Sequence, residues 1–237
     1  MRNLVDLHTH TTFCNHAYST LNENIVKASE IGIEILGWSE HGYGMKNTTN
    51  RFMFSNFRVI PKIINDVRVL KGMEANIYDF RGTIYEQDML PVVDYVIASL
   101  HRNCISAGSE KENTSAIIGA IENKYVNILG HLDDGYYSLD FDEIAKVAKE
   151  YNVAIEINNS SLVEDSFRLN SRENILKMLE KCDKYGTSII MNTDAHFLTE
   201  IGDVSKSEEI IKEYKFNEEL ILNYNIENLK YFINTDL

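Results

Sequence analysis

The sequence predicts a single α/β domain in which seven strand-and-helix repeats close into a barrel. Two observations lead to this prediction. Short apolar runs alternate with longer amphipathic segments along the chain, and most of the runs end beside a histidine or a carboxylate. Strands that alternate with helices of this length are typical of parallel βαβ units. Because 237 residues suffice for one domain with a full hydrophobic core, we expect a single domain over residues 1–237.

The first half of the chain contains four of the predicted strands, at residues 3–7, 33–39, 69–73 and 92–99. The apolar spacing predicts a helix over residues 22–31, with Gly32 as its stop. Residues 61–67 are expected to form a short helix. Residues 42–58 are polar and aromatic without a clear period, so we expect them to form a loop over the strand ends.

The second half contains three more strands, at residues 126–129, 153–157 and 188–191. Helical spacing predicts helices over residues 114–123, 140–151, 171–185, 204–214 and 226–233. Asp140 is the expected N-cap of the second of these, and Gly186 would end the third. In closed barrels of parallel strands the active site lies at the C-terminal ends of the strands.

All seven histidines lie where a metal site at those strand ends would need them: His8, His10, His16, His41, His101, His131 and His196. Glu74 and Asp194 occupy two more such positions. His8 and His10 are two residues apart after a strand, so their side chains share one face. A single pair of this kind is a weak signal, but its repetition at successive strand ends predicts one site built by several metal ligands.

Neutral imidazole suits zinc, iron and related ions, and carboxylates add oxygen ligands. Ligating histidines usually donate their second N–H to a carboxylate or carbonyl, and Asp6 and Glu40 are candidates for that position. Three cysteines at wide spacing form neither a disulfide framework nor a metal-binding pair, and we do not expect Cys14 to be a ligand.

The net charge of −13 argues against a protein that binds long nucleic acid, which would be expected to show a basic face. Bound metal ions would still make the site attractive to an anionic substrate. No apolar run approaches the roughly 20 residues of a membrane span, and the N-terminus enters a strand without signal-peptide features. We therefore expect a cytoplasmic protein with no membrane partner. The sequence leaves a homo-oligomer open.

Taken together, these motifs resemble the PHP (polymerase and histidinol phosphatase) superfamily, and most closely its stand-alone bacterial branch of YcdX-type phosphatases. The motifs are Asp6-Leu7-His8-Thr9-His10, His16, Ser39-Glu40-His41, Gly72-Met73-Glu74-Ala75-Asn76, His101, Gly130-His131 and Asp194-Ala195-His196. The resemblance covers nearly the whole chain. It implies a distorted TIM-like (β/α)7 barrel with a trinuclear metal site.

By motif matching, the resemblance implies three divalent ions, usually zinc, with manganese or iron as alternatives. The first ion would be held by His8, His10, Glu74 and Asp194. Glu74 would bridge to a second ion held by His101 and His131. The third would be held by His16, His41 and His196.

The expected reaction is hydrolysis of small phosphomonoesters by a metal-bound hydroxide, because metal ions lower the pKa of bound water and neutralise phosphate charge. We expect catalytic roles for Glu74, Asp194 and His196. Arg58 and Arg168 are expected to bind the phosphate, since the planar guanidinium suits that group. Arg102, beside His101, is a third candidate, for which a surface position is favoured over phosphate binding.

Three alternatives remain open at this point. The protein could be a phosphodiesterase or exonuclease, although its acidity offers no help in binding long nucleic acid. It could hydrolyse histidinol phosphate, as sister enzymes of the superfamily do. It could also be a metal-binding module without turnover, which a turnover assay would distinguish from an enzyme. The composition of residues 42–58 is specific to this chain and leaves the substrate open.

Overall fold

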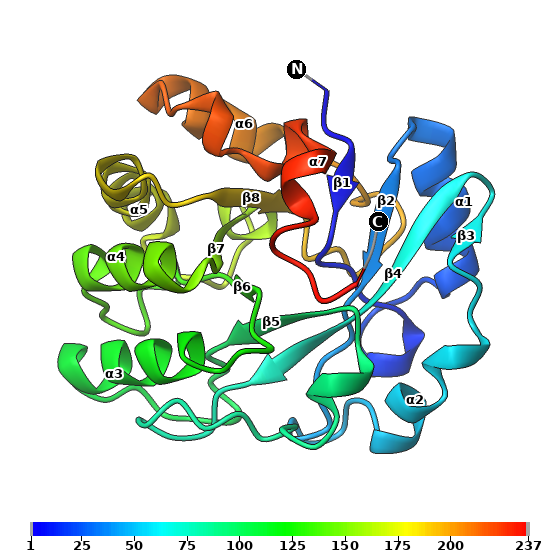
Figure 1. Ribbon diagram of the computed structural model, residues 1–237, viewed down its shortest axis with the longest axis horizontal. Coiled ribbons are helices and arrows are strands. Elements are labelled where there is room, and N and C mark those ends of the chain that lie inside the picture. The colour runs from blue at the N-terminus through cyan, green and yellow to red at the C-terminus, as the bar shows by residue number, and fades with distance from the viewer. Residues whose placement is uncertain (1, 236–237) are drawn as a thin grey trace.

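The computed structural model describes residues 2–235, and a parallel sheet that curves into an almost closed barrel lies at its centre (Figure 1). Seven parallel strands follow one another in the order β1 (Val5–Asp6), β2 (Ile35–Trp38), β4 (Val67–Asn76), β5 (Tyr95–Ser99), β6 (Ile128–Leu129), β7 (Ala154–Asn158) and β8 (Ile189–Asn192). The predicted distorted, TIM-like (β/α)7 barrel is therefore confirmed.

The barrel closes between its first and last strands through loop and side-chain contacts instead of a regular ladder. Thr9 and Ala195 form an isolated parallel bridge, in which the backbone N–H of His10 donates to Ala195 O over 2.9 Å. The side chain of Asn192 accepts the N–H of Leu7 at 2.9 Å. This closure lays the segment that carries His8 and His10 beside the segment that carries Asp194 and His196.

The outside of the barrel carries α1 (Leu21–Ile31), α3 (Glu110–Ile121), α4 (Phe141–Tyr151), α5 (Ser171–Tyr185) and α6 (Ser205–Tyr214) (Figure 1). The short helix α7 (Ile226–Leu229) instead lies across one end of the barrel, where Leu229 packs in one buried cluster with Val5 and Ile190. Asp140 caps α4 through bonds to two backbone N–H groups, as expected. Gly186 ends α5 at φ 68°, a left-handed conformation that glycine adopts without strain. Each helix was predicted, with ends that differ by a few residues.

The predicted short helix at residues 61–67 is wrong. These residues form a hairpin, in which β3 (Ile63–Ile64) pairs antiparallel with the start of β4. Asn65 and Asp66 form the two-residue turn at φ 51° and 63°. Type I′ turns need positive φ at both central positions, which asparagine and aspartate tolerate better than most residues. The turn preference of the Asn-Asp pair therefore decided the local structure, and the helical spacing of the apolar residues did not.

Residues 42–58, which we call the cover loop, are not entirely irregular. They contain a short helix, α2 (Arg51–Ser55), which Asn50 caps, followed by a 3-10 turn at Phe57–Val59. Phe54 and Phe57 are buried and pack at 5.3 Å between ring centroids, which anchors the loop to the core. The expectation of a loop without regular structure is therefore corrected at these residues.

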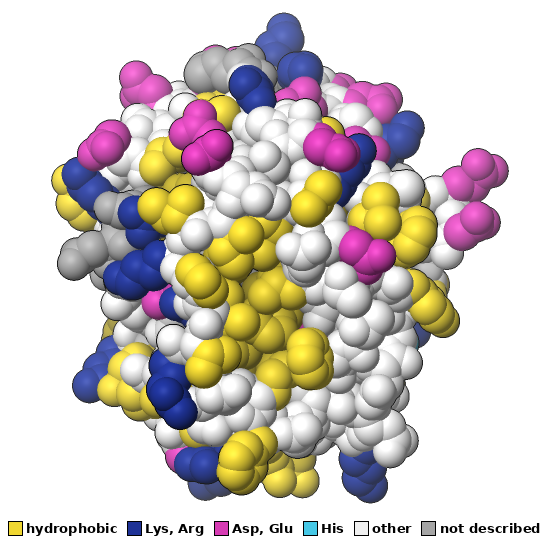
Figure 2. Space-filling view, turned by 90° about the vertical axis from the view of Figure 1, so that its right-hand side faces the viewer, with side chains coloured by type: hydrophobic (Ala, Val, Ile, Leu, Met, Phe, Trp, Pro, Cys, Tyr) yellow, Lys and Arg dark blue, Asp and Glu magenta, His cyan; other side chains and the backbone are white. Residues whose placement is uncertain are grey.

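Figure 2 shows the side of the barrel that carries α1, α2 and the hairpin, where hydrophobic side chains gather at the surface. Val26 of α1 and Ile63 of the hairpin are 38% and 58% exposed, and Val59 of the 3-10 turn is 56% exposed. No histidine is visible on this face. The histidine cluster therefore does not open here.

Within residues 2–235, none of the helices has an apolar stretch of the length that a membrane span requires.

Tyr95 fills the interior of the barrel close to the strand that carries Glu74. It is fully buried, and its hydroxyl donates to the carbonyl of Leu7. Gly37 and Gly72 leave room for the ring, because a Cβ built at Gly72 would lie 2.2 Å from Tyr95 Cζ. The two glycines are therefore required by packing, because a Cβ at Gly37 would likewise lie 2.1 Å from the Tyr95 hydroxyl.

Replacement of Gly72 by alanine should therefore destabilise the fold. Overpacking of this kind costs about 1–3 kcal/mol in free energy of unfolding. Urea denaturation of the metal-free protein would measure it. In a Tyr95→Leu background the added methyl group has no ring to meet, so its cost should be smaller than in the parent chain. Equal costs in both backgrounds would refute this packing argument.

Candidate metal centre

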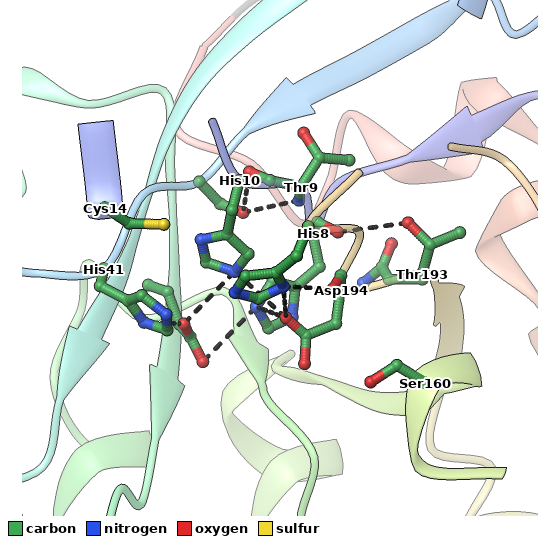
Figure 3. A network of polar contacts seen from close by, with 12 residues as sticks. His8, Thr9, His10, Cys14, His41, Ser160, Thr193 and Asp194 are labelled. Carbon is green, nitrogen blue, oxygen red and sulfur yellow. Dashed lines mark hydrogen bonds and ion pairs between the residues drawn. The ribbon is translucent and has the colours of Figure 1, made fainter. Parts of the chain in front are cut away.

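The structure brings the seven histidines, Glu74 and Asp194 into one cluster, which is buried except on the side of His16, His101 and His196. They come from the C-terminal parts of the strands and the loops that follow them. Figure 3 shows His8, His10, His41 and Asp194 turned toward one another. The Nε2 atoms of His8 and His10 lie 3.5 and 3.2 Å from Asp194 Oδ1. This convergence matches the positions that the sequence singled out.

Glu74 lies at the centre of the cluster. The sequence analysis placed it after a strand, but β4 continues to Asn76, so Glu74 lies inside the strand and pairs with Ile97 of β5. Its side chain is 1% exposed. Nitrogens of five histidines lie between 2.6 and 3.7 Å from its two carboxylate oxygens: His8, His101 and His131 around Oε1, and His10 and His41 around Oε2.

His16, His41 and His196 form the outer side of the cluster, where it meets the cavity. The Nε2 atoms of His16 and His41 are 3.1 Å apart. The ring of His196 lies 4.8 Å from that of His16 and 4.4 Å from that of His10, measured between centroids. The three rings that the motif match assigned to one ion are therefore neighbours in space.

Hydrogen bonds fix which nitrogen of four rings faces the cluster. The Nδ1 atoms of His16 and His196 lie 2.9 Å from the backbone carbonyls of Cys14 and Asp194. Those of His8 and His101 lie 2.8 Å from Glu156 Oε1 and Asn76 Oδ1. All four partners are acceptors, so each Nδ1 carries the proton. Each Nε2 is left as a donor atom for a metal ion, the arrangement that second contacts of metal-ligating histidines usually produce.

Several buried polar atoms in the cluster have no hydrogen-bond partner among residues 2–235. They include Nε2 of His8 and His10, Nδ1 of His41 and Oε2 of Glu74. Buried polar groups are normally paired, because an unpaired one costs free energy. Imidazole nitrogens gathered around carboxylate oxygens are the ligand atoms that divalent ions such as zinc accept. The donor set therefore fits metal ions, and groups of three such residues include His8, His10 and Asp194.

Burial and neighbouring charges have opposite effects on the pKa values of Glu74 and His10. Burial raises the pKa of the Glu74 carboxyl, but His101, His41 and His8 outweigh it and hold that pKa well below its usual range. Burial lowers the pKa of His196 to about 4. Burial also lowers the pKa of His10, but Asp194 and Glu40 outweigh it and bring that pKa to about 9. Glu74 therefore remains an anionic group at neutral pH.

Glu156 is a residue of the site to which the sequence analysis assigned no role. It is fully buried in β7, and its Oε1 accepts the Nδ1–H of His8. Its Oε2 accepts the backbone N–H of His131 at 2.8 Å and a side-chain N–H of Asn158 at 3.0 Å. The signal for it was a lone carboxylate within an apolar strand, Ala-Ile-Glu-Ile. A charge buried in a strand needs partners of this kind.

Asp6 and Glu40 were expected to accept N–H groups from the histidine rings. Asp6 instead accepts the backbone N–H groups of Thr193 and Gly202, at 3.2 and 2.9 Å, and so holds the segment that leads to Asp194. Glu40 Oε2 lies 3.7 Å from Nδ1 of His10, and its Oε1 accepts Trp38 Nε1–H at 2.9 Å. Glu40 therefore faces a histidine ring at longer range, whereas Asp6 acts on the backbone.

Two residues of the cluster hold unusual backbone conformations. His131 has φ 32° and Asp194 has φ 55°. Positive φ is uncommon for residues other than glycine, and such conformations gather at functional sites where the surroundings hold them. Glu156 accepts the backbone N–H of His131, and Asp6 accepts the backbone N–H of Thr193, the residue before Asp194. Buried carboxylates therefore hold the backbone at both positions of positive φ.

A cavity of about 620 Å³ opens onto the histidine cluster. Its walls include Met45, Lys46, Asn47 and Thr48 of the cover loop and, on other sides, Asn15, Leu100, Arg102, Asn103, Asp134, Ser160, Phe167 and Arg168. The expectation that the cover loop lies over the strand ends therefore agrees with the structure. A small molecule in this cavity would touch both the cluster and the loop.

The three arginines considered in the sequence analysis have different surroundings. Arg168 is buried at the cavity wall and donates to Asp194 Oδ2 at 2.7 Å and to Ser160 Oγ at 3.0 Å. Arg102 also lines the cavity, and its Nη2 donates to both carboxylate oxygens of Asp134, at 2.9 and 2.8 Å. Arg58 is exposed and lies outside the cavity wall. The structure therefore brings Arg168 and Arg102 to the site and leaves Arg58 at the surface.

Comparison with known proteins places this site in a family. A model of the PHP domain matches residues 6–160. A probable phosphatase of Clostridium botulinum (strain Hall) is 44% identical over 237 residues, covering 99% of this chain and 96% of the relative. A probable phosphatase of Caldicellulosiruptor bescii is 40% identical, covering 97% and 95%.

A solved structure has the same fold at low sequence identity. It is the histidinol phosphate phosphatase of Lactococcus lactis in complex with zinc, L-histidinol and phosphate, with a TM-score of 0.62 and 17% identity. The match covers 92% of this chain and 95% of that one. At this identity the likeness shows the shared fold, whereas the family model and the relatives show the family. The chain belongs to the PHP domain family, among relatives described as probable phosphatases.

Proposed function

We propose that this protein is a metal-dependent phosphatase that hydrolyses small phosphomonoesters at a site of three divalent ions. The observation that carries the proposal is the cluster of seven histidines, Glu74 and Asp194. Within it, buried imidazole nitrogens and a carboxylate oxygen lie close together without hydrogen-bond partners. Zinc is the favoured metal because the donor set is rich in imidazole, and manganese and iron suit such a set as well.

The nine side chains divide into three ligand sets around the ions. His8, His10, Asp194 and Glu74 would hold the first, and Glu74 would bridge to the second, held by His101 and His131. His16, His41 and His196 would hold the third. When bound, the ions would supply hydroxide near neutral pH and charge neutralisation for the phosphate.

The protein's own residues would bind and orient the phosphate. The Arg168 guanidinium points toward Asp194 and Ser160 at the cavity wall, where its planar N–H groups could also reach phosphate oxygens. Its bond to Asp194 would hold that carboxylate in place for the ions. The buried carboxylates of Glu74 and Asp194 remain anionic, and His196 remains neutral because burial lowers its pKa to about 4.

The shape and charge of the molecule favour small substrates. A cavity of about 620 Å³ is within the range of pockets that enclose small molecules. The cover loop forms part of its wall, which would limit the approach of a long polymer. The net charge of −13 offers no steering for a nucleic acid beyond the site itself.

The deciding experiment is a turnover screen of the metal-loaded protein. The panel would contain p-nitrophenyl phosphate, phosphorylated metabolites including histidinol phosphate, bis-p-nitrophenyl phosphate, and single- and double-stranded DNA. The proposal expects hydrolysis of monoesters and little or no cleavage of DNA. Efficient DNA cleavage without monoester hydrolysis would favour a nuclease, and bound metal without turnover would favour a metal-binding module.

Replacement of Arg168 by lysine should weaken catalysis although lysine keeps the positive charge. Lysine keeps one positive charge but loses the planar fork that reaches Asp194 and the phosphate together. We expect kcat/KM for p-nitrophenyl phosphate to fall by about 10- to 100-fold, the usual range for residues that support a metal site. Arg58→Lys, at an exposed arginine outside the cavity wall, is the matched control. If Arg168→Lys had the same kinetics as Arg58→Lys, Arg168 would have no part in phosphate binding or in holding the metal site.

A further inference from the structure

Glu86 is a buried carboxylate outside the ligand sets, in the segment between β4 and β5. It is 0% exposed. Its Oε1 accepts the backbone N–H of Gly44 at 2.8 Å and the Nδ2–H of Asn76 at 2.7 Å, and its Oε2 accepts the backbone N–H of Asn76 at 3.0 Å. Three donors thus converge on one buried acid, and their hydrogen bonds offset part of the cost of its burial. The proposed function assigns this residue no role.

Asn76, the last residue of β4, links Glu86 to His101. Its Nδ2 donates to Glu86 and to the carbonyl of Gly42 at 3.1 Å. Because both partners are acceptors, the NH₂ group must face them and Oδ1 must face His101. Nδ1 of His101, 2.8 Å from that oxygen, therefore carries a proton, which leaves Nε2, 2.9 Å from Glu74 Oε1, as the ring nitrogen for a metal ion. Glu86 thus helps to determine which nitrogen of His101 is free.

The same carboxylate holds the beginning of the cover loop. Gly42 donates its backbone N–H to Glu74 O at 2.7 Å, and Gly44 donates to Glu86. The fit is close, because a Cβ at Gly42 would lie 2.3 Å from Glu86 Cδ. The next residues, 45–48, line the cavity. One buried acid therefore bonds both to the loop over the cavity and to the partner of a cluster histidine.

We propose that Glu86 is a positioning residue that joins the cover loop to His101 through Asn76. The proposal rests on the proposed function only in taking His101 as a metal ligand. Its consequence is that metal retention and the order of the cover loop depend on the same carboxylate. A change at Glu86 should therefore alter both properties, although the residue touches neither the ions nor the substrate.

Asp88 provides a matched control, because it holds the same loop from a different place. Its carboxylate accepts the hydroxyl of Tyr43 and the Nε–H of Arg51, the latter at 2.7 Å. Its side chain is 54% exposed. Within residues 2–235 no hydrogen bond or ion pair joins it to Asn76 or to a histidine. Loss of Asp88 should loosen the loop without reaching the metal cluster.

The test compares Glu86→Gln with Asp88→Asn. Glutamine has nearly the shape of glutamate, but its NH₂ group replaces one of two oxygens that both face N–H donors. We expect zinc to bind about ten-fold more weakly, at the low end of the effect of residues around metal ligands. Excess zinc should restore kcat for p-nitrophenyl phosphate while KM stays raised. Amide hydrogen exchange at residues 42–49 of the metal-free, full-length protein should become faster.

Asp88→Asn should accelerate exchange in the cover loop and leave zinc affinity at the parent value. Parent zinc affinity and parent exchange in Glu86→Gln would overturn the proposal, as would an equal loss of zinc affinity in Asp88→Asn. If Glu86→Gln does not fold, Asn76→Ala must lose zinc affinity and loop protection together, and loss of only one would refute the link. Because exchange is measured without metal, a parent protein that binds no zinc would refute the proposed function, and loop exchange would still decide whether Glu86 holds the loop.

Discussion

Replacement of Glu74 by glutamine should remove metal and activity together, with the largest effect of any single change in the cluster. Both oxygens of Glu74 face histidine nitrogens, so the carboxylate can bridge two ions. Glutamine keeps the size but loses the charge, and its NH₂ group would point at one of the ions. The positive charges of the ions would then repel each other without the anion between them.

We expect Glu74→Gln to lose at least one metal equivalent and more than about 100-fold in kcat/KM, because residues that merely support ligands already cost 10- to 100-fold. Elemental analysis and p-nitrophenyl phosphate kinetics would measure both. Glu112→Gln is the control, since Glu112 belongs to the capping box of α3 and glutamine also serves there. Parent metal content and rate in Glu74→Gln would exclude a bridging role.

The sequence predicted the barrel because its local and long-range patterns agree. Asp140 at the start of α4 and Gly186 at the end of α5 mark helix boundaries by their own conformational preferences. The histidines fall after strands for a different reason, the chemistry at the strand ends. Parallel strands in a closed barrel bring those ends to one rim, so residues from His8 to His196 could be expected to meet.

The hairpin at β3 could not be found from the apolar pattern. The register of Ile63 opposite Arg68 is fixed by the positive φ of Asn65 and Asp66, which is a property of the turn. The spacing of apolar residues carries no information about that turn. Recognition of the Asn-Asp pair as a type I′ turn would have predicted the strand and excluded the helix.

The residues that orient the ligands were harder to predict than the ligands themselves. Glu156 is 148 residues from His8 in the chain, and Asn76 is 25 from His101. Their roles depend on the register of neighbouring strands and on side-chain direction, which the spacing of motifs does not specify. Asp6 and Glu40 were chosen because they adjoin the ligands in sequence, and Asp6 proved to bind backbone N–H groups instead of a histidine ring.

Removal of the metal ions should abolish phosphatase activity while the chain stays folded. The hydrophobic core is built from apolar side chains outside the cluster, and within the cluster Glu156 pairs with His8 at 2.8 Å without any metal. The fold should still lose stability, because a ligand that binds only the folded state stabilises it by about 2.7 kcal/mol at 100 times its Kd. We therefore expect a lower Tm after chelation and a rise in Tm with added zinc.

Dialysis against a strong chelator, followed by titration with zinc or manganese, would test this with three measurements on one sample. Activity toward p-nitrophenyl phosphate should fall to background and return with added metal, and circular dichroism should show a folded protein throughout. Elemental analysis of the reloaded protein should find about three ions per chain, the number that the nine clustered side chains would hold if Glu74 bridges two of them. A single ion in fully active protein would contradict the trinuclear assignment, because the sets around His101 and around His16 would then contribute no metal to the reaction.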